Sequence, residues 1–196
     1  MKQLKALLPV LALTLSLTGA QAITFTSDTA IGVGNTTYDG QGIIVSGCTL
    51  TVDGPHAFTS LLVTNSGAVT HSPAPNGETN NWLNLTIAGD VTVDATSVIS
   101  GNGRGYGSGS GPGSGSTGYC GSRTMGGGAG HGGFGGATVC GIPGGPSYGS
   151  LLQPVTPGSG GGSPGGTGGG TVRMSVAGTL RVDGQLTANG TNGQGG

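Results

Sequence analysis

Two stretches of this 196-residue chain repeat one another across a glycine-rich tract. Residues 83–94 (LNLTIAGDVTVD) match residues 172–183 (VRMSVAGTLRVD) at every apolar position, and, after a two-residue gap in the alignment, 99–103 match 186–190. A looser third copy runs from Val45 to Gly54. Each copy alternates apolar and polar residues as a strand does, bends at a small residue followed by glycine, forms a second strand and ends in a turn that contains aspartate.

One such unit has too little apolar surface to form a core alone, so the repeat predicts units that stack into a solenoid. Residues 62–70 give a further strand, bend and strand, and the rungs then begin near residues 45, 63 and 87. A spacing of about 20 residues is typical of parallel β-helices. We therefore predict an all-β, right-handed parallel β-helix over residues 23–100 and 171–196. A β-sandwich is the alternative, since short strands with regular turns suit it too.

The tract from 101 to 170 is a long insertion between two rungs. Of its 70 residues 31 are glycine, and it contains two arginines and no carboxylate. Ordering it costs more conformational entropy than its few apolar side chains return on burial. We expect an insertion that is mobile or only locally ordered. Packed, polyproline-II-like glycine strands are the alternative, but they need a three-residue period and the glycine spacing here is irregular.

The first 22 residues have the pattern of a secretory signal peptide. Lys2 and Lys5 precede an apolar run from Ala6 to about Leu17, and Gly19-Ala20-Gln21-Ala22 predicts cleavage after Ala22. The run is short for a membrane span of about 20 residues. The sequence predicts a protein that is secreted or held at the cell surface, without a membrane span in the mature chain.

The charge of the mature chain excludes several classes of function. Cleavage removes both lysines, and the four scattered arginines that remain form no cationic face for nucleic acid. Without lysine there is no P-loop. The two G-x-S-x-G matches, at 145–149 and 161–165, are as many as chance gives in such a tract. We expect no catalytic activity and no cofactor.

The cysteines predict a disulfide. Cys120 and Cys140 bracket a glycine-rich loop in the exported part of the chain, where disulfides persist, so we expect them to pair. Cys48 stands in an alternating run and is expected to be a small buried hydrophobe, although an odd cysteine also permits an intermolecular bridge. No cysteine pair has zinc-site spacing and the histidines are scattered, so we predict no metal centre.

Three aspartates, Asp53, Asp94 and Asp183, hold the same place in the three repeats. Stacked rungs would bring them together as a weak cation site or as paired carboxylates for acid/base work on a polysaccharide. We favour a simpler interpretation, in which each aspartate accepts backbone N–H bonds within its own turn. His56 and His71 fall in turn-rich stretches and are expected on loop surfaces or in cap packing.

The signal peptide, the repeated apolar-Ala-Gly-x-apolar-x-Val-Asp unit, the Ile-Ser-Gly-Asn-Gly and Leu-Thr-Ala-Asn-Gly segments and the glycine tract are found together. This combination resembles the N-terminal part of large bacterial secreted or cell-surface β-helix proteins with glycine-rich insertions, of the repetitive adhesin-like kind. The resemblance implies a parallel β-helix with a surface role and supplies no catalytic residue. The chain ends at 189–196, where the equivalent position near 102 enters the insertion, so we expect a truncated member of this group.

These observations predict an exported structural or adhesive surface module. A surface glycan or the neighbouring domains of a larger protein are the candidate partners. The alternative is a carbohydrate-binding or polysaccharide-lyase-like β-helix protein.

Overall fold

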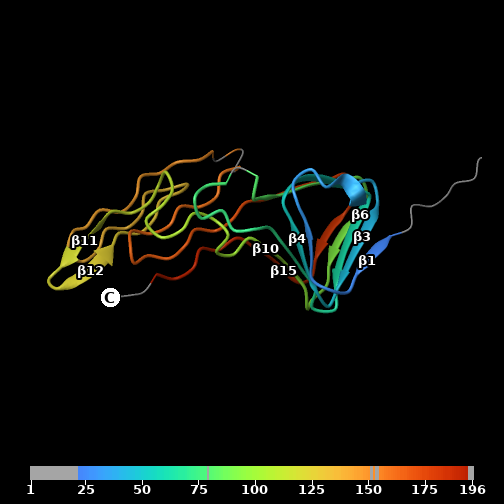
Figure 1. Cartoon of the computed structure of the whole chain (residues 1–196), viewed down its shortest axis with the longest axis horizontal. Coiled ribbons are helices and arrows are strands. Elements are labelled where there is room, and N and C mark those ends of the chain that lie inside the picture. The colour runs from blue at the N-terminus through green and yellow to red at the C-terminus, as the bar shows by residue number, and fades with distance from the viewer. Residues whose placement is uncertain (1–21, 79, 151, 153–154, 194–196) are drawn as a thin grey trace, which may run out of the picture.

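Stacked parallel strands form one end of the molecule in the computed structural model, and a long glycine-rich arm extends from them along its longest axis (Figure 1). The structure describes residues 22–78, 80–150, 152 and 155–193, so residues 1–21 of the predicted signal peptide lie outside it. Among the described residues the one helical element is the 3-10 turn η1 (Thr36–Tyr38). The described part of the chain therefore contains no helix long and apolar enough to span a membrane.

The solenoid has three sheets, which the chain visits in turn on each circuit, or rung, except that residues 32–41 of the first rung form no strand of the third sheet. In order along the stack, the first sheet contains β1 (Ile23–Phe25), β3 (Gly42–Ser46), β6 (Ser60–Thr64), β9 (Val91–Val93) and β14 (Leu180–Val182). The second contains β2 (Thr29–Ile31), β4 (Thr49–Val52), β7 (Ala68–Thr70), β10 (Val98–Ser100) and β15 (Gln185–Thr187). The third contains β5 (Gly54–Phe58), β8 (Leu83–Ile87) and β13 (Val172–Val176).

Every neighbouring pair in these sheets is parallel, which confirms the parallel β-helix and excludes the sandwich. The two halves of the repeat pair in the register that the self-alignment predicts. Leu83 lies opposite Val172, Val93 opposite Val182, and Ile99 opposite Leu186.

The third copy of the repeat was aligned to the wrong sheet. Leu50 to Val52 form β4 and pair with β7 in the second sheet, whereas 91–93 form β9 in the first. Similarly, residues 45 and 63 are equivalent, but 87 lies in the third sheet and the equivalent position is Val93. The error arises because strand, turn and aspartate recur at more than one corner of the rung.

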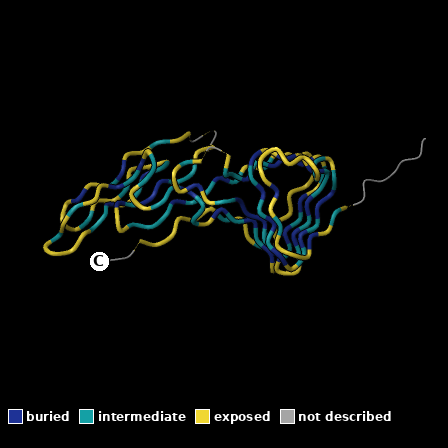
Figure 2. Tube along the Cα trace, viewed as in Figure 1, coloured by how far each residue is buried: buried dark blue, intermediate teal, exposed yellow. Residues whose placement is uncertain are grey.

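Buried positions lie above one another from rung to rung in the solenoid (Figure 2), and their apolar side chains form one core cluster. One column in the first sheet contains Val45, Val63 and Val93, each 0% exposed. The alternating sequence produces this core because successive strand side chains point to opposite faces, so every second residue enters the column.

The insertion, here called the arm (residues 101–170), leaves the solenoid after β10 and returns at β13. The one regular element among its described residues is an antiparallel hairpin of β11 (Thr117–Cys120) and β12 (Arg123–Gly126), at the end farthest from the solenoid (Figure 1). Between hairpin and solenoid the arm consists of long segments that lie side by side, joined by backbone hydrogen bonds. This arrangement differs from the mobile insertion that the entropy argument predicts.

Glycine allows these segments to approach one another closely. A Cβ added at Gly113 would lie 2.5 Å from the carbonyl oxygen of Gly130. Added at Gly145, it would overlap the carbonyl oxygen of Gly113, and at Gly135 that of Gly128. Backbone therefore packs directly on backbone. Side chains do not cover these peptide groups, which form hydrogen bonds with one another.

The hydrogen bonds within the arm recur every three residues. The carbonyl oxygen of Ser110 accepts from Gly160, and those of Gly113 and Ser116 accept from Gly130 and Gly127 of another segment. The N–H groups of Gly145 and Tyr148 donate to Gly128 and His131. Three residues per turn is the period of polyproline II, whereas β-ladders alternate with period two. Packed, polyproline-II-like glycine strands, the alternative named above, are therefore the better description of the arm. The three-residue period appears in the hydrogen bonds and not in the spacing of the glycines.

Two adjacent glycines test this packing directly. We expect Gly135→Ala to lower the stability of the arm by about 1–3 kcal/mol, because its Cβ would overlap the backbone of Gly128. Gly136→Ala is the matched control, since a Cβ there meets no atom within 4 Å. Hydrogen exchange of the arm amides measures both, and equal effects of the two substitutions would contradict the close packing.

Candidate functional site: the arm, its root, its grooves and its tip

The arm leaves and rejoins the solenoid at its root. The loop that joins β7 to β8, here called the excursion, forms hydrogen bonds with this root. The N–H of Ala74 donates to the carbonyl of Arg104 (2.9 Å), and the N–H of Gly107 donates to the carbonyl of Pro75 (3.0 Å). The ring of Tyr106 lies where a Cβ at Gly77 would be. The excursion therefore holds the first segment of the arm against the solenoid.

His71 is buried at this root, 0% exposed, against Gly170 at the end of the arm. Its Nδ1 lies 2.8 Å from the carbonyl oxygen of Ser72, and its Nε2 has no partner among the described residues. Burial lowers the pKa of His71, an effect that Arg104 adds to and that the Ser72 carbonyl and Asp53 oppose. The imidazole is therefore neutral at neutral pH, with the proton on Nδ1.

His56 is also buried. Its Nδ1 lies 3.0 Å from a carboxylate oxygen of Asp39, and its ring stacks on that of Phe58. The expectation that these two histidines lie on loop surfaces or in cap packing was therefore wrong. The strand alternation of 54–58 identifies His56 as inward-facing, but no local signal identifies His71, because the glycine that covers it is 99 positions further along the chain.

A few side chains fix the interior of the arm. Tyr148 packs edge-on against the ring of His131, with centroids 4.7 Å apart, and His131 Nε2 lies 3.1 Å from the carbonyl oxygen of Thr156. Ser159 is buried, and its hydroxyl oxygen accepts the N–H of Gly113 at 2.9 Å. Burial raises the pKa of Tyr148. These contacts join segments far apart in sequence.

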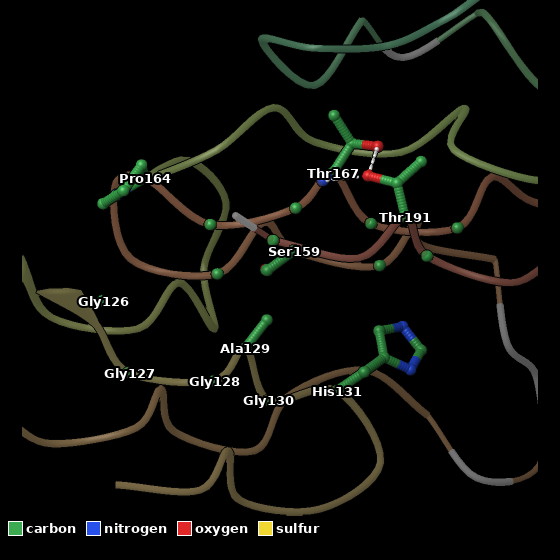
Figure 3. A pocket seen from close by; sticks show the side chains of 18 of the residues that line it. Gly126, Gly127, Gly128, Ala129, Gly130, His131, Ser159, Pro164, Thr167 and Thr191 are labelled. Carbon is green, nitrogen blue, oxygen red and sulfur yellow. Dashed lines mark hydrogen bonds between the residues drawn. The ribbon is translucent and has the colours of Figure 1, made fainter. Parts of the chain in front are cut away.

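A groove of about 620 Å³ runs along the arm (Figure 3). Its walls are residues 124–131, parts of 158–169, and Gly190, Thr191 and Gly193. The Thr167 and Thr191 hydroxyls lie 2.9 Å apart at its edge, and the His131 ring stands on the opposite side (Figure 3). A second groove of about 490 Å³ shares His131 and continues to Val172 and Leu186 on the last rung. In the part of the chain that the structure describes, no carboxylate, lysine or arginine lines either groove.

The tip of the arm consists of two turns joined by a disulfide. Cys120 bonds to Cys140, with Cα atoms 5.7 Å apart, which confirms the predicted pair. Tyr119 and Val139, next to the two cysteines, are 79% and 94% exposed. Arg123 is exposed, and its side chain has no hydrogen-bond or ion-pair partner among the described residues. The tip thus presents a tyrosine, a valine and an arginine to solvent.

The three predicted aspartates do not converge. Asp94 and Asp183 follow paired strands of the first sheet, but Asp53 follows β4 in the second sheet and lies at another corner. Among the described residues no three His, Cys, Asp or Glu side chains are placed to hold a metal ion.

Each aspartate makes its own set of contacts instead. Asp53 accepts from the N–H (2.7 Å) and hydroxyl (2.6 Å) of Ser72, one rung away. Asp94 accepts from the Thr64 hydroxyl (2.6 Å) and from the N–H of Thr96 (2.9 Å); these bonds, that of Thr64 foremost, hold its pKa well below the usual range. Asp183 pairs with Arg181 in the open (2.7 Å). The bond from Thr96 to Asp94 fits the turn interpretation. That interpretation was wrong for Asp53, whose bonds join two rungs, and for Asp183, which pairs with a side chain.

Cys48 is buried in the solenoid core, and its thiol lies 3.3 Å from the carbonyl oxygen of Phe25. It packs as a small hydrophobe, as predicted, and is not placed for an intermolecular bridge.

Comparisons with protein-family models, with curated proteins and with solved structures return no match for this chain. The residues and their geometry are therefore the basis for the function proposed below.

The stability of the root should depend on pH through His71. Because the pKa of His71 is lowered in the folded state, only the unfolded chain takes up this proton as the pH falls below about 6.5. The His71 contribution is complete above that pH and is lost as the pH falls. We expect the urea midpoint to drop between pH 7.5 and 5.5, and His71→Asn to reduce the drop.

The partly exposed His131 provides the matched control for this measurement. His131→Asn should keep the pH dependence of the native chain. If His71→Asn and the native chain lose stability equally on acidification, His71 is not the group responsible.

Proposed function

We propose that this chain is an exported structural and adhesive surface module. The parallel β-helix serves as a stiff stalk, and the arm carries a contact surface away from it. The carrying observation is the disulfide-tied tip, which exposes Tyr119 and Val139 at the end of an arm whose backbone is hydrogen-bonded along its length.

The composition of the tip supports adhesion. Large apolar side chains in the solenoid are mostly buried, so a tyrosine and a valine that are about four-fifths or more exposed need another explanation than packing. Tyrosine and arginine are among the residues enriched at the hot spots of protein interfaces. An arm already ordered by backbone bonds and a disulfide loses less conformational entropy on binding than a mobile one.

A surface glycan is the partner class we favour. An exposed tyrosine ring offers a flat apolar face beside a hydroxyl donor, and Arg123 adds a free cation for acidic groups. The lyase-like alternative has less support, because the described residues that line the two grooves include one base, His131, and no carboxylate to act with it.

Export fits the same proposal. The disulfide is compatible with an extracellular location, where such bonds persist. The predicted cleavage after Ala22 would release a mature chain that begins at Ile23, the first residue of β1.

The experiment is a glycan-array and cell-adhesion assay of the mature protein, residues 23–196. We expect binding that Tyr119→Ala with Arg123→Gln weakens by about tenfold or more, the effect of losing about 1.4 kcal/mol. Val33→Ser, which changes a half-exposed valine in the solenoid, is the control and should bind normally. Equal binding by the tip variant, or no binding by the native protein to any glycan or cell, would contradict the proposal.

A further inference from the structure

The disulfide at the tip joins an exposed cysteine to a less exposed one. Cys140 is exposed in the turn that runs from Thr138 to Ile142, whereas Cys120 is half-buried at the end of β11. Thiolates attack a disulfide at the sulfur that they can reach, and exposed disulfides are more labile than buried ones. An approaching thiolate therefore reaches Cys140 more readily than Cys120.

Arg123 lies beside the other cysteine. It is directly opposite Cys120 in the β11–β12 hairpin, so the two side chains share one face of the hairpin. Arg123 is exposed, and its guanidinium has no hydrogen-bond or ion-pair partner among the described residues. A cation in this place stabilises negative charge on the Cys120 sulfur, which makes Cys120 the better leaving group.

The turn around Cys140 also has contacts that do not depend on the disulfide. The N–H of Ser116 donates to the carbonyl of Pro143 (3.0 Å), and within the turn the N–H of Thr138 donates to the carbonyl of Ile142 (2.9 Å). Ile142 is 9% exposed, and a Cβ added at Gly118 of the hairpin would lie 3.1 Å from its side chain. We therefore expect the tip to stay folded when the disulfide opens.

From these observations we infer that the tip disulfide is an exchange site for a cysteine thiol of a partner protein. The thiol loses its proton to water, and the resulting thiolate attacks Cys140 Sγ and forms a new sulfur–sulfur bond. The Cys120–Cys140 bond breaks, and its electron pair leaves on Cys120 Sγ as a thiolate. One disulfide is consumed and one is formed, so the exchange needs no external oxidant or reductant.

The surroundings of Cys140 favour a protein thiol. Tyr119 and Val139, next to the two cysteines, are 79% and 94% exposed, so they are free to contact apolar residues that flank a partner's cysteine. Residues 101–170 contain no carboxylate that would repel an approaching thiolate. The exchange thus attaches a partner covalently at the end of the arm.

Cys120 makes this attachment reversible. The two Cα atoms are 5.7 Å apart in the closed form, and the turn is held against the hairpin, so the Cys120 thiolate stays within reach of Cys140. It can attack the new disulfide and release the partner. The inference does not depend on glycan binding, because the exchange uses the sulfur atoms of the tip and is measured without a glycan.

Peptide exchange followed by mass spectrometry tests this inference on residues 23–196. The probe is a neutral peptide with one cysteine flanked by leucines, and iodoacetamide then alkylates the free thiols. Trypsin cleavage after Arg123 separates the two cysteines, so we expect to find the peptide on Cys140 and the alkyl group on Cys120. The reverse assignment, or an adduct that forms only after urea unfolds the chain, would overturn the inference.

The Arg123→Gln variant tests the part of the cation. We expect its exchange to be about threefold slower, because the leaving thiolate loses the neighbouring positive charge. Arg173→Gln, which removes an exposed arginine of the solenoid, is the matched control and should exchange at the native rate. Equal rates in the two variants would contradict the choice of Cys120 as leaving group.

Glutathione serves as the probe for a small thiol. At equal thiolate concentration it should exchange more slowly than the peptide, because no apolar residues flank its cysteine to contact Tyr119 and Val139. Exchange with glutathione as fast as with the peptide would overturn the assignment of a protein thiol as the partner.

Discussion

This molecule depends on backbone hydrogen bonds between neighbouring segments of the arm. These bonds form because no side chain separates the segments. At Gly135 or Gly145 a single added carbon would overlap a neighbouring carbonyl. Its absence lets N–H groups reach oxygens on segments distant in sequence, so that buried peptide groups are paired. An account based on side-chain burial misses this contribution, since the arm has few apolar side chains to bury.

The solenoid and the arm use the same backbone chemistry in two periods. In the solenoid, alternation with period two directs every second side chain into a column, as at Val45, Val63 and Val93. In the arm, hydrogen bonds recur at every third residue and the columns are replaced by bare backbone. The period changes from two to three after Ser100 and returns to two at Val172. The neutral His71 is buried where the solenoid and the arm meet.

The sequence predicted what depends on local alternation. The register of Leu83 with Val172 and of Ile99 with Leu186 followed from apolar positions alone. Likewise, the Cys120–Cys140 pair followed from spacing and compartment. The sheet to which each strand of the third copy belongs could not be predicted in this way. Strand, turn and aspartate recur at two corners of the rung, and only the pairing of β4 with β7 distinguishes the two corners.

The arm was harder to predict for a related reason. Its three-residue period belongs to backbone donors and acceptors, and every residue carries the acceptor. Ser110 or Ser116 therefore fills an acceptor position as well as glycine does. Glycine is needed only where a neighbouring segment approaches. The sequence predicted the cysteine pair of the tip but not its exposed surface. The exposure of Tyr119 depends on the position of the hairpin at the end of the arm, which no local pattern indicates.

Residue-resolved hydrogen exchange of the arm tests the central claim most directly. The amides of Gly127 and Gly130, which donate to Ser116 and Gly113, should exchange slowly, whereas that of Ala129, which has no acceptor among the described residues, should exchange quickly. Uniformly fast exchange from 101 to 170 would show that backbone bonds do not order the arm and would contradict this account.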